Sequence, residues 1–120
     1  MRLTFIETSA FTRRIVEMGL DERPRQLELR LEEKPTLGVV DPGTGGVRKI
    51  RMGDPGRSKG TRGGTRVHYL YLPSRSQVYL LFVYSKDERE TLTARQKRQL
   101  RRIVEAIKEV TRAATAGGER

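Results

Sequence analysis

The chain has no cysteine, no tryptophan and a single histidine, His68, among its 120 residues. Without cysteine it has neither a disulfide framework nor a zinc site built on thiolates. With one histidine it lacks a nuclease mechanism that needs two. The longest apolar run, residues 78–84, is much shorter than the ~20 residues that a membrane-spanning helix needs. The first residues also lack the long apolar segment of a signal peptide, so we expect a cytoplasmic protein with no membrane partner.

Positive charge is abundant and unevenly distributed. The net charge is +10, which favours a polyanionic partner such as nucleic acid. Residues 45–68 hold seven Arg or Lys and one Asp, and residues 93–112 hold seven Arg or Lys and two Glu. The concentration of charge in two segments indicates a binding surface rather than a uniformly solvated exterior.

The apolar pattern predicts one α+β domain of the order β-α-α-β-β-β-α, with a mainly antiparallel twisted sheet and helices packed on it. A chain of this length supports one hydrophobic core. We expect strands at residues 2–7, 47–52, 65–72 and 77–85, and helices at residues 9–18, 21–33 and 93–112. The domain then covers residues 1–112, and residues 113–120 form a flexible tail.

The basic residues of the first charged segment fall on two strands and a glycine-rich loop. Strand alternation puts Lys49 and Arg51 on one face and Ile50 and Met52 on the other. An antiparallel neighbouring strand brings Arg66 to the face of Lys49 and Arg51. The remaining members of the segment are candidates for binding RNA: Arg48, Arg57, Lys59, Arg62 and His68.

Cleavage of RNA by its own 2′-hydroxyl needs a base, cations that stabilise the added negative charge, and an acid. Arginine suits the second role and is too basic for the others. Lys49 and Lys86 are candidate bases because neighbouring cations disfavour a protonated lysine, with Tyr84 and His68 as candidate partners. Both partners also fit an interior position, since Tyr84 ends an apolar strand. No phosphate-binding loop, metal-ligand cluster or carboxylate pair is present in the sequence, and we expect no metal or cofactor.

Three segments taken together resemble the RelE/HigB superfamily of toxins from type II toxin–antitoxin systems, and the HigB branch most closely. They are GGVRKIR at residues 45–51, RGGTRVHY at residues 62–69 and YLLFVYSK at residues 79–86. The resemblance covers about residues 3–107. It implies a RelE-like fold and a ribosome-dependent, metal-independent endoribonuclease, an mRNA interferase that inhibits translation. Its implied partners are mRNA in the ribosomal A site, 16S-type ribosomal RNA and a cognate helix-turn-helix antitoxin.

The resemblance also implies roles for particular residues. Lys49 and Lys86 correspond to proton-transfer residues, and Arg51 and Arg66 to residues that stabilise the phosphate or the transition state. The chain departs from the family pattern at Ser85-Lys86-Asp87, where RelE-like members carry Gly-Lys-Arg, and it has no tyrosine after Tyr84. The general base and acid therefore stay open, with Tyr84 included among the catalytic candidates.

Two other functions fit the same sequence. A ParE-like toxin of the same fold would act on DNA gyrase, although that branch generally lacks this set of basic residues. A non-catalytic RNA-binding or ribosome-binding protein would use the same charge without cleavage, and its binding would weaken steeply with salt.

Overall fold

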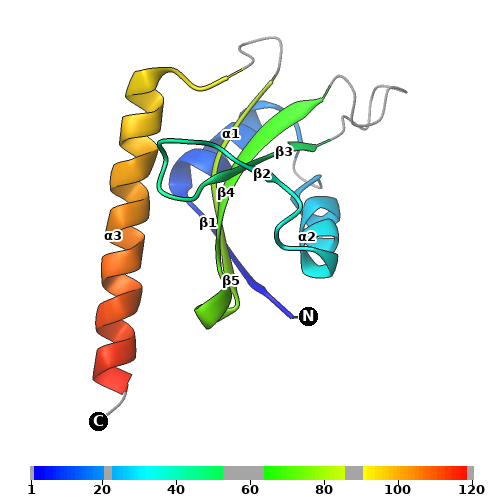
Figure 1. The fold of residues 1–120 in the computed structure, drawn as a ribbon. Coiled ribbons are helices and arrows are strands. Elements are labelled where there is room, and N and C mark those ends of the chain that lie inside the picture. The colour runs from blue at the N-terminus through cyan, green and yellow to red at the C-terminus, as the bar shows by residue number, and fades with distance from the viewer. Residues whose placement is uncertain (1, 21–22, 53–63, 86–90, 119–120) are drawn as a thin grey trace.

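The computed structural model describes residues 2–20, 23–52, 64–85 and 91–118 (Figure 1). Within these residues, five strands form one mixed sheet and three α-helices pack around it, so the predicted α+β class is confirmed. In chain order the elements are β1 (Thr4–Glu7), α1 (Ser9–Glu17), α2 (Arg23–Glu33), β2 (Val39–Val40), β3 (Arg48–Met52), β4 (Thr65–Leu72), the 3₁₀ turn η1 (Pro73–Arg75), β5 (Gln77–Ser85) and α3 (Ala94–Gly118).

The sheet has the strand order β1-β5-β4-β3-β2. β1 runs parallel to β5 and the other neighbours are antiparallel, which confirms the mainly antiparallel sheet. The two-residue strand β2 was not predicted, because a strand of that length shows no alternation. Tyr69 of β4 holds the segment just before β2: its hydroxyl accepts a hydrogen bond from the Gly38 N–H at 2.8 Å and donates one to the Pro35 carbonyl oxygen at 2.8 Å.

A β-bulge interrupts the pairing of β4 with β5. His68 pairs with Phe82 while the next residue, Tyr69, pairs with Leu80, so Leu81 is an extra residue in β5. The Thr8 hydroxyl donates a hydrogen bond to the Leu81 carbonyl oxygen at 2.9 Å. This bond gives the Leu81 carbonyl oxygen a partner where the bulge interrupts the hydrogen bonding between β4 and β5.

The sheet separates two apolar clusters. On one face, α1 contributes Phe11 and Ile15 and α2 contributes Leu27 and Leu31 to the larger cluster. On the other face, Leu100 and Val104 of α3 pack with side chains of β4 and β5. Figure 1 shows the same layers, with α3 on one side of the sheet and α2 on the other. Helical spacing of the apolar residues therefore decided which face each helix buries.

The helix ends follow the predicted capping residues. The Thr8 hydroxyl accepts the Phe11 N–H at 3.1 Å, and Gly19 has a φ of +67° just after α1, where glycine is favoured. Thr93 and Gln96 form the predicted capping box, with reciprocal bonds of 3.0 and 3.1 Å. The predicted cap of α2, Asp21, lies outside the described residues.

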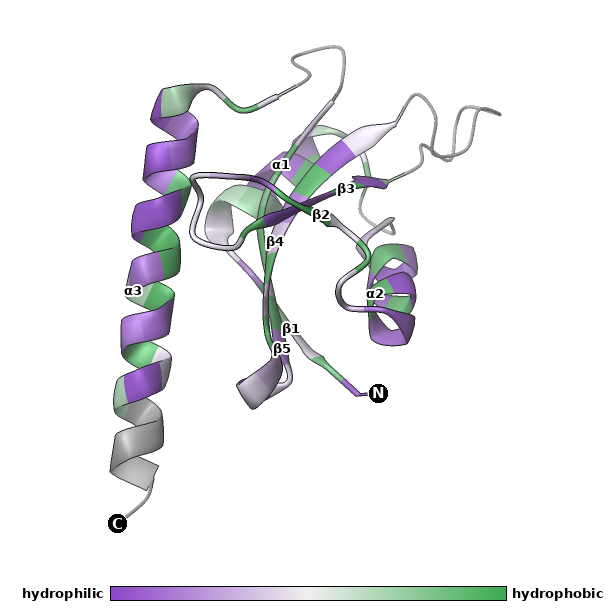
Figure 2. Ribbon diagram, in the orientation of Figure 1, coloured by the Kyte–Doolittle hydropathy of each residue, from purple (hydrophilic) through white to green (hydrophobic). Residues whose placement is uncertain are grey.

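Helix α3 is longer than predicted. It continues to Gly118 and takes in most of the segment expected to form a tail, residues 113–120. Hydrophilic residues cover much of α3, as the colouring of Figure 2 shows. In the part of the chain that the structure describes, no helix has both the length and the apolar character required to cross a membrane.

Candidate nucleic-acid interface

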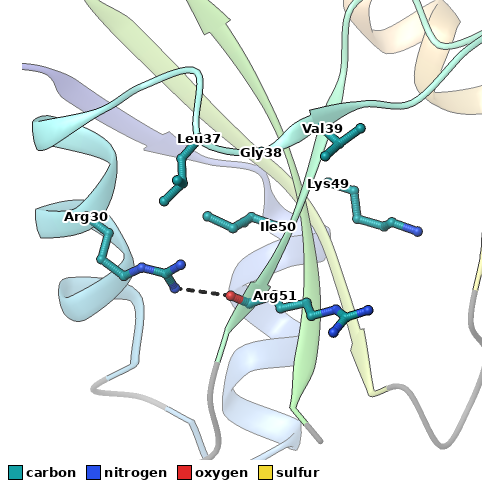
Figure 3. Close-up of a pocket in the computed structure, with 7 residues that line it drawn as sticks. All are labelled: Arg30, Leu37, Gly38, Val39, Lys49, Ile50 and Arg51. Atoms are coloured by element: carbon teal, nitrogen blue, oxygen red, sulfur yellow. Dashed lines mark hydrogen bonds between the residues drawn. The ribbon is translucent and has the colours of Figure 1, made fainter. Parts of the chain in front are cut away.

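The predicted alternation along β3 is confirmed. Ile50 and Met52 are buried in the cluster beneath α1 and α2, whereas Lys49 is half-buried and Arg51 is exposed. Figure 3 shows the Lys49 and Arg51 side chains pointing to one side of β3 while Ile50 points to the other, toward Arg30. The two cations therefore share the face of the sheet on which α3 packs.

Cross-strand pairing extends this face into two rows. Arg51 pairs with Arg66, which in turn pairs with Tyr84, and Lys49 pairs with His68, which pairs with Phe82. Directly paired residues point to the same face of a sheet. We call the surface formed by five of these residues the cationic face: Lys49, Arg51, Arg66, His68 and Tyr84. Of the described members of the predicted site, the structure thus brings together all but Arg48, and their roles stay predictions.

The members of the cationic face lie at different depths. Arg66, His68 and Tyr84 expose 3%, 0% and 1% of their surface, so β4 and β5 carry a buried polar layer. One Arg66 nitrogen, Nη1, donates a hydrogen bond to the Gly64 carbonyl oxygen at 3.2 Å. Lys49 and Arg51, on the strand nearer the sheet edge, are the more accessible members. His68 was predicted to bind RNA, but its fully buried side chain makes no direct contact with solvent in this structure.

His68 lies between a tyrosine and a carboxylate. Its Nε2 is 3.1 Å from the Tyr84 hydroxyl, and the two rings stack with centroids 5.4 Å apart. Its Nδ1 is 3.8 Å from Oδ2 of Asp41. Burial lowers the pKa of His68 to about 4; Asp41 opposes this shift and Lys49 adds to it. The imidazole is therefore neutral at neutral pH.

Asp41 is a member of this site that the sequence did not reveal. It stands in the turn-forming segment Asp41-Pro42-Gly43, where its chemistry suits a turn, and nothing in the local sequence links it to His68. Its own backbone N–H donates to the Val47 carbonyl oxygen at 2.8 Å, which holds the start of the β2–β3 loop. Only the folded sheet brings the two side chains together.

Arg48 lies on the opposite face from Lys49, so it is not part of the cationic face, and its assignment as an RNA-binding residue stays a prediction. Its Nη1 donates hydrogen bonds to the Gly38 carbonyl oxygen at 2.8 Å and to the Thr36 carbonyl oxygen at 3.3 Å. It is paired with Tyr69, whose side chain belongs to the cluster beneath α1 and α2. Arg48 therefore anchors the segment before β2.

Two lysines of α3 hold the β2–β3 loop against the helix. Lys97 Nζ is 3.4 Å from Oδ1 of Asp41, and Lys108 Nζ donates to the Gly45 carbonyl oxygen at 3.1 Å. Gly45 lies so close to α3 that a Cβ atom there would be 3.3 Å from the side chain of Val104. Part of the basic side of α3 therefore has a structural role. Five arginines of the helix are exposed: Arg95, Arg98, Arg101, Arg102 and Arg112.

An open pocket of about 450 Å³ lies at the edge of the sheet next to the cationic face (Figure 3). It is lined by Arg30, Leu37, Gly38, Val39, Lys49, Ile50 and Arg51. The Arg30 Nη1 donates to the Arg51 carbonyl oxygen at 3.1 Å across it. The lining of the pocket therefore combines three apolar residues with three basic ones.

Four predicted site residues lie outside the described residues: Arg57, Lys59, Arg62 and Lys86. Their assignments stay predictions. Among the residues that are described, no three His, Asp or Glu side chains gather closely enough to hold a metal ion.

A scan of the chain against protein-family models finds no match.

Proposed function

We propose that the chain is a toxin of the RelE/HigB kind, an endoribonuclease that cuts mRNA in the ribosomal A site, with the cationic face as its cleavage site. The observation that carries the proposal is the row Arg51–Arg66–Tyr84 beside Lys49 on one face of the sheet. This row combines groups that stabilise negative charge with groups that can transfer protons. The resemblance of the three sequence segments adds the ribosome and an antitoxin as partners, with action in the cytoplasm.

In the proposed chemistry a ribose 2′-hydroxyl loses its proton to a base, and its oxygen attacks the adjacent phosphorus atom. The bond from phosphorus to the 5′-oxygen then breaks, leaving a 2′,3′-cyclic phosphate, and an acid gives a proton to the departing 5′-oxygen. Negative charge develops on the phosphate oxygens during the attack, and guanidinium groups suit its stabilisation because they offer several N–H donors in a planar fork. Arg51 is exposed and accessible to the phosphate, while Arg66 supplies charge from beneath it. We assign proton transfer to Lys49, with Lys86 and Tyr84 as the other candidates.

Only part of the cationic face is accessible to RNA. His68 and Tyr84 are almost completely buried, so free RNA has direct access to Lys49 and Arg51 but not to the whole set. Positioning of the message by 16S-type ribosomal RNA would supply alignment that the protein surface does not supply alone. We therefore expect weak cleavage of naked RNA.

The test is the addition of purified protein to a translating extract, followed by primer extension on a defined mRNA. We expect new 5′ ends within translated codons, their loss when ribosomes are omitted, and their loss with Lys49→Met. A translating extract without new ends would contradict the proposed function. Intact mRNA together with blocked supercoiling by gyrase would instead support a ParE-like toxin.

A second candidate is an RNA-binding or ribosome-binding protein without catalysis, and the burial of Arg66, His68 and Tyr84 favours it. In that case Lys49 and Arg51 would bind backbone phosphate while the buried layer only supports the sheet. Binding to RNA that falls steeply with salt, with no cleavage in the translating extract, would establish this function.

A further inference from the structure

The side chains of Asp41, His68 and Tyr84 form a line of neighbours, and all three are buried or nearly so. Asp41 follows β2, His68 is on β4 and Tyr84 is on β5, so three separate segments meet there. The distance from Asp41 Oδ2 to His68 Nδ1 is 3.8 Å, and that from His68 Nε2 to the Tyr84 hydroxyl is 3.1 Å. The imidazole is fully buried, so its two nitrogens depend on protein groups.

The charges around the line restrict the position of the imidazole hydrogen. A neutral imidazole carries hydrogen on one nitrogen and a lone pair on the other. Nδ1 makes no hydrogen bond with any described residue, and the group that faces it is the Asp41 carboxylate. A lone pair on Nδ1 would face the lone pairs of a carboxylate in a buried site, whereas an N–H there points its positive end at them. The arrangement therefore favours hydrogen on Nδ1.

The position of that hydrogen then determines the direction of the Tyr84 hydroxyl. With hydrogen on Nδ1, Nε2 has only a lone pair, and it must accept a hydrogen bond from the Tyr84 O–H. We propose that Asp41 is a positioning residue, which holds His68 in its Nδ1–H tautomer so that His68 fixes the Tyr84 hydroxyl beside Arg66. The contribution of this line to RNA cleavage rests on the proposed function; the tautomer and the hydrogen bond do not.

Two lysines adjoin the line from other elements. Lys97 of α3 lies 3.4 Å from Oδ1 of Asp41, on the side away from His68, and so ties the carboxylate to the helix. Lys49 of β3 is the cross-strand neighbour of His68 and disfavours a second proton on the imidazole. Lys97 thus contacts the Asp41 carboxylate, and Lys49 favours the neutral form of the His68 imidazole. The network thus links α3 to the cationic face.

The first arm of the test is nitrogen NMR of the whole protein at pH 7, with labelled histidine. His68 is the only histidine, so its two ring nitrogens give unambiguous signals. We expect hydrogen on Nδ1 in the wild-type protein. In Asp41→Asn the side-chain amide can donate to Nδ1, and we expect the hydrogen to move to Nε2. In Lys97→Met the carboxylate remains, and we expect the wild-type tautomer.

The second arm is cleavage in the translating extract. Asp41→Asn should lower the cleavage rate about tenfold and change its pH profile, as expected for a misdirected proton-transfer group, while Arg112→Gln, at an exposed position of α3 outside this line, retains most of the rate. Hydrogen on Nε2 in the wild-type protein, or the same tautomer in Asp41→Asn as in wild type, would overturn the inference. The expected tautomers with no cleavage by any variant would support the positioning and refute the proposed function.

Discussion

Arg51 and Arg66 lie directly opposite each other on β3 and β4, so two like charges are cross-strand neighbours on the same face of the sheet. Like charges placed directly opposite each other destabilise a strand pair. A bound anion between them would remove this repulsion. We therefore expect a phosphate group to bind the cationic face next to this pair.

We expect inorganic phosphate to raise the melting temperature of the protein through this pair. A ligand at a hundred times its Kd adds about 2.7 kcal/mol to the free energy of unfolding. Phosphate also stabilises proteins in general by exclusion from their surfaces, so the control is Arg51→Gln in the same buffers. The measurement is thermal unfolding at constant ionic strength. Equal shifts in wild type and Arg51→Gln would show that the pair binds no phosphate.

Removal of either accessible cation should lower RNA cleavage with little effect on the fold. We expect Lys49→Met and Arg51→Gln each to reduce the rate of mRNA cleavage by about 10²–10³, the usual effect of losing one transition-state-stabilising group. Circular dichroism should be unchanged, since neither side chain belongs to an apolar cluster. Arg112→Gln is the matched control, because Arg112 is exposed and paired with Glu109 at 3.0 Å. A comparable loss in that variant would indicate a non-specific effect of charge.

Arg66 should differ from Arg51 in its effect on stability. It is 3% exposed and donates to the Gly64 carbonyl oxygen, so Arg66→Met leaves a buried acceptor without that donor. We expect a loss of about 1–3 kcal/mol in the free energy of unfolding by urea. Arg51→Gln, at the exposed position opposite, should change the same quantity by less than about 0.5 kcal/mol. Equal stability of the two variants would contradict the buried position of Arg66.

Stability should fall in acid through His68. Its pKa is about 4 in the folded protein and near 6.5 in the unfolded chain, so between these values the unfolded chain binds a proton that the folded protein does not. The free energy of unfolding therefore decreases as the pH falls from 6.5 toward 4, by about 3 kcal/mol in all. Urea unfolding at pH 7 and pH 4.5 measures this loss. His68→Gln should lose less over the same range, and parallel profiles would show that His68 does not cause it.

Gly38 should not tolerate a side chain. A Cβ atom there would lie 2.8 Å from Cε1 of Tyr69 and 2.9 Å from the Lys49 carbonyl oxygen. Gly38→Ala must therefore move β2 away from β3 or displace the Tyr69 ring, and we expect a loss of roughly 1–3 kcal/mol. Tyr69→Phe removes the hydroxyl bonds to Gly38 and Pro35 and should cost a similar amount. Thermal unfolding of both variants tests this, and wild-type stability would contradict the close approach.

The sequence predicted the strands around the site well because their patterns are local. The bounds of β4 and β5 agree with the apolar runs at residues 65–72 and 77–85, and alternation assigned the faces of Lys49 and Arg51. The same alternation places Arg48 on the other face, but Arg48 was predicted to bind RNA from its charge alone. The contacts that remained hidden are long-range: β2 depends on Tyr69, and the approach of Asp41 to His68 depends on how three strands assemble.

The bulge in β5 also determines how this chain must be compared with its relatives. With Leu81 as an extra residue, Tyr84 and Phe82 face α3, whereas Leu80 and Val78 face the opposite cluster, so even-numbered positions change sides within one uninterrupted strand. A homologue without the bulge has one residue fewer between the two halves. A correct alignment must then place its gap inside the strand rather than in a loop. An alignment that avoids this gap would match Tyr84 with a position that faces the opposite cluster, and an inherited tyrosine would look like a substitution.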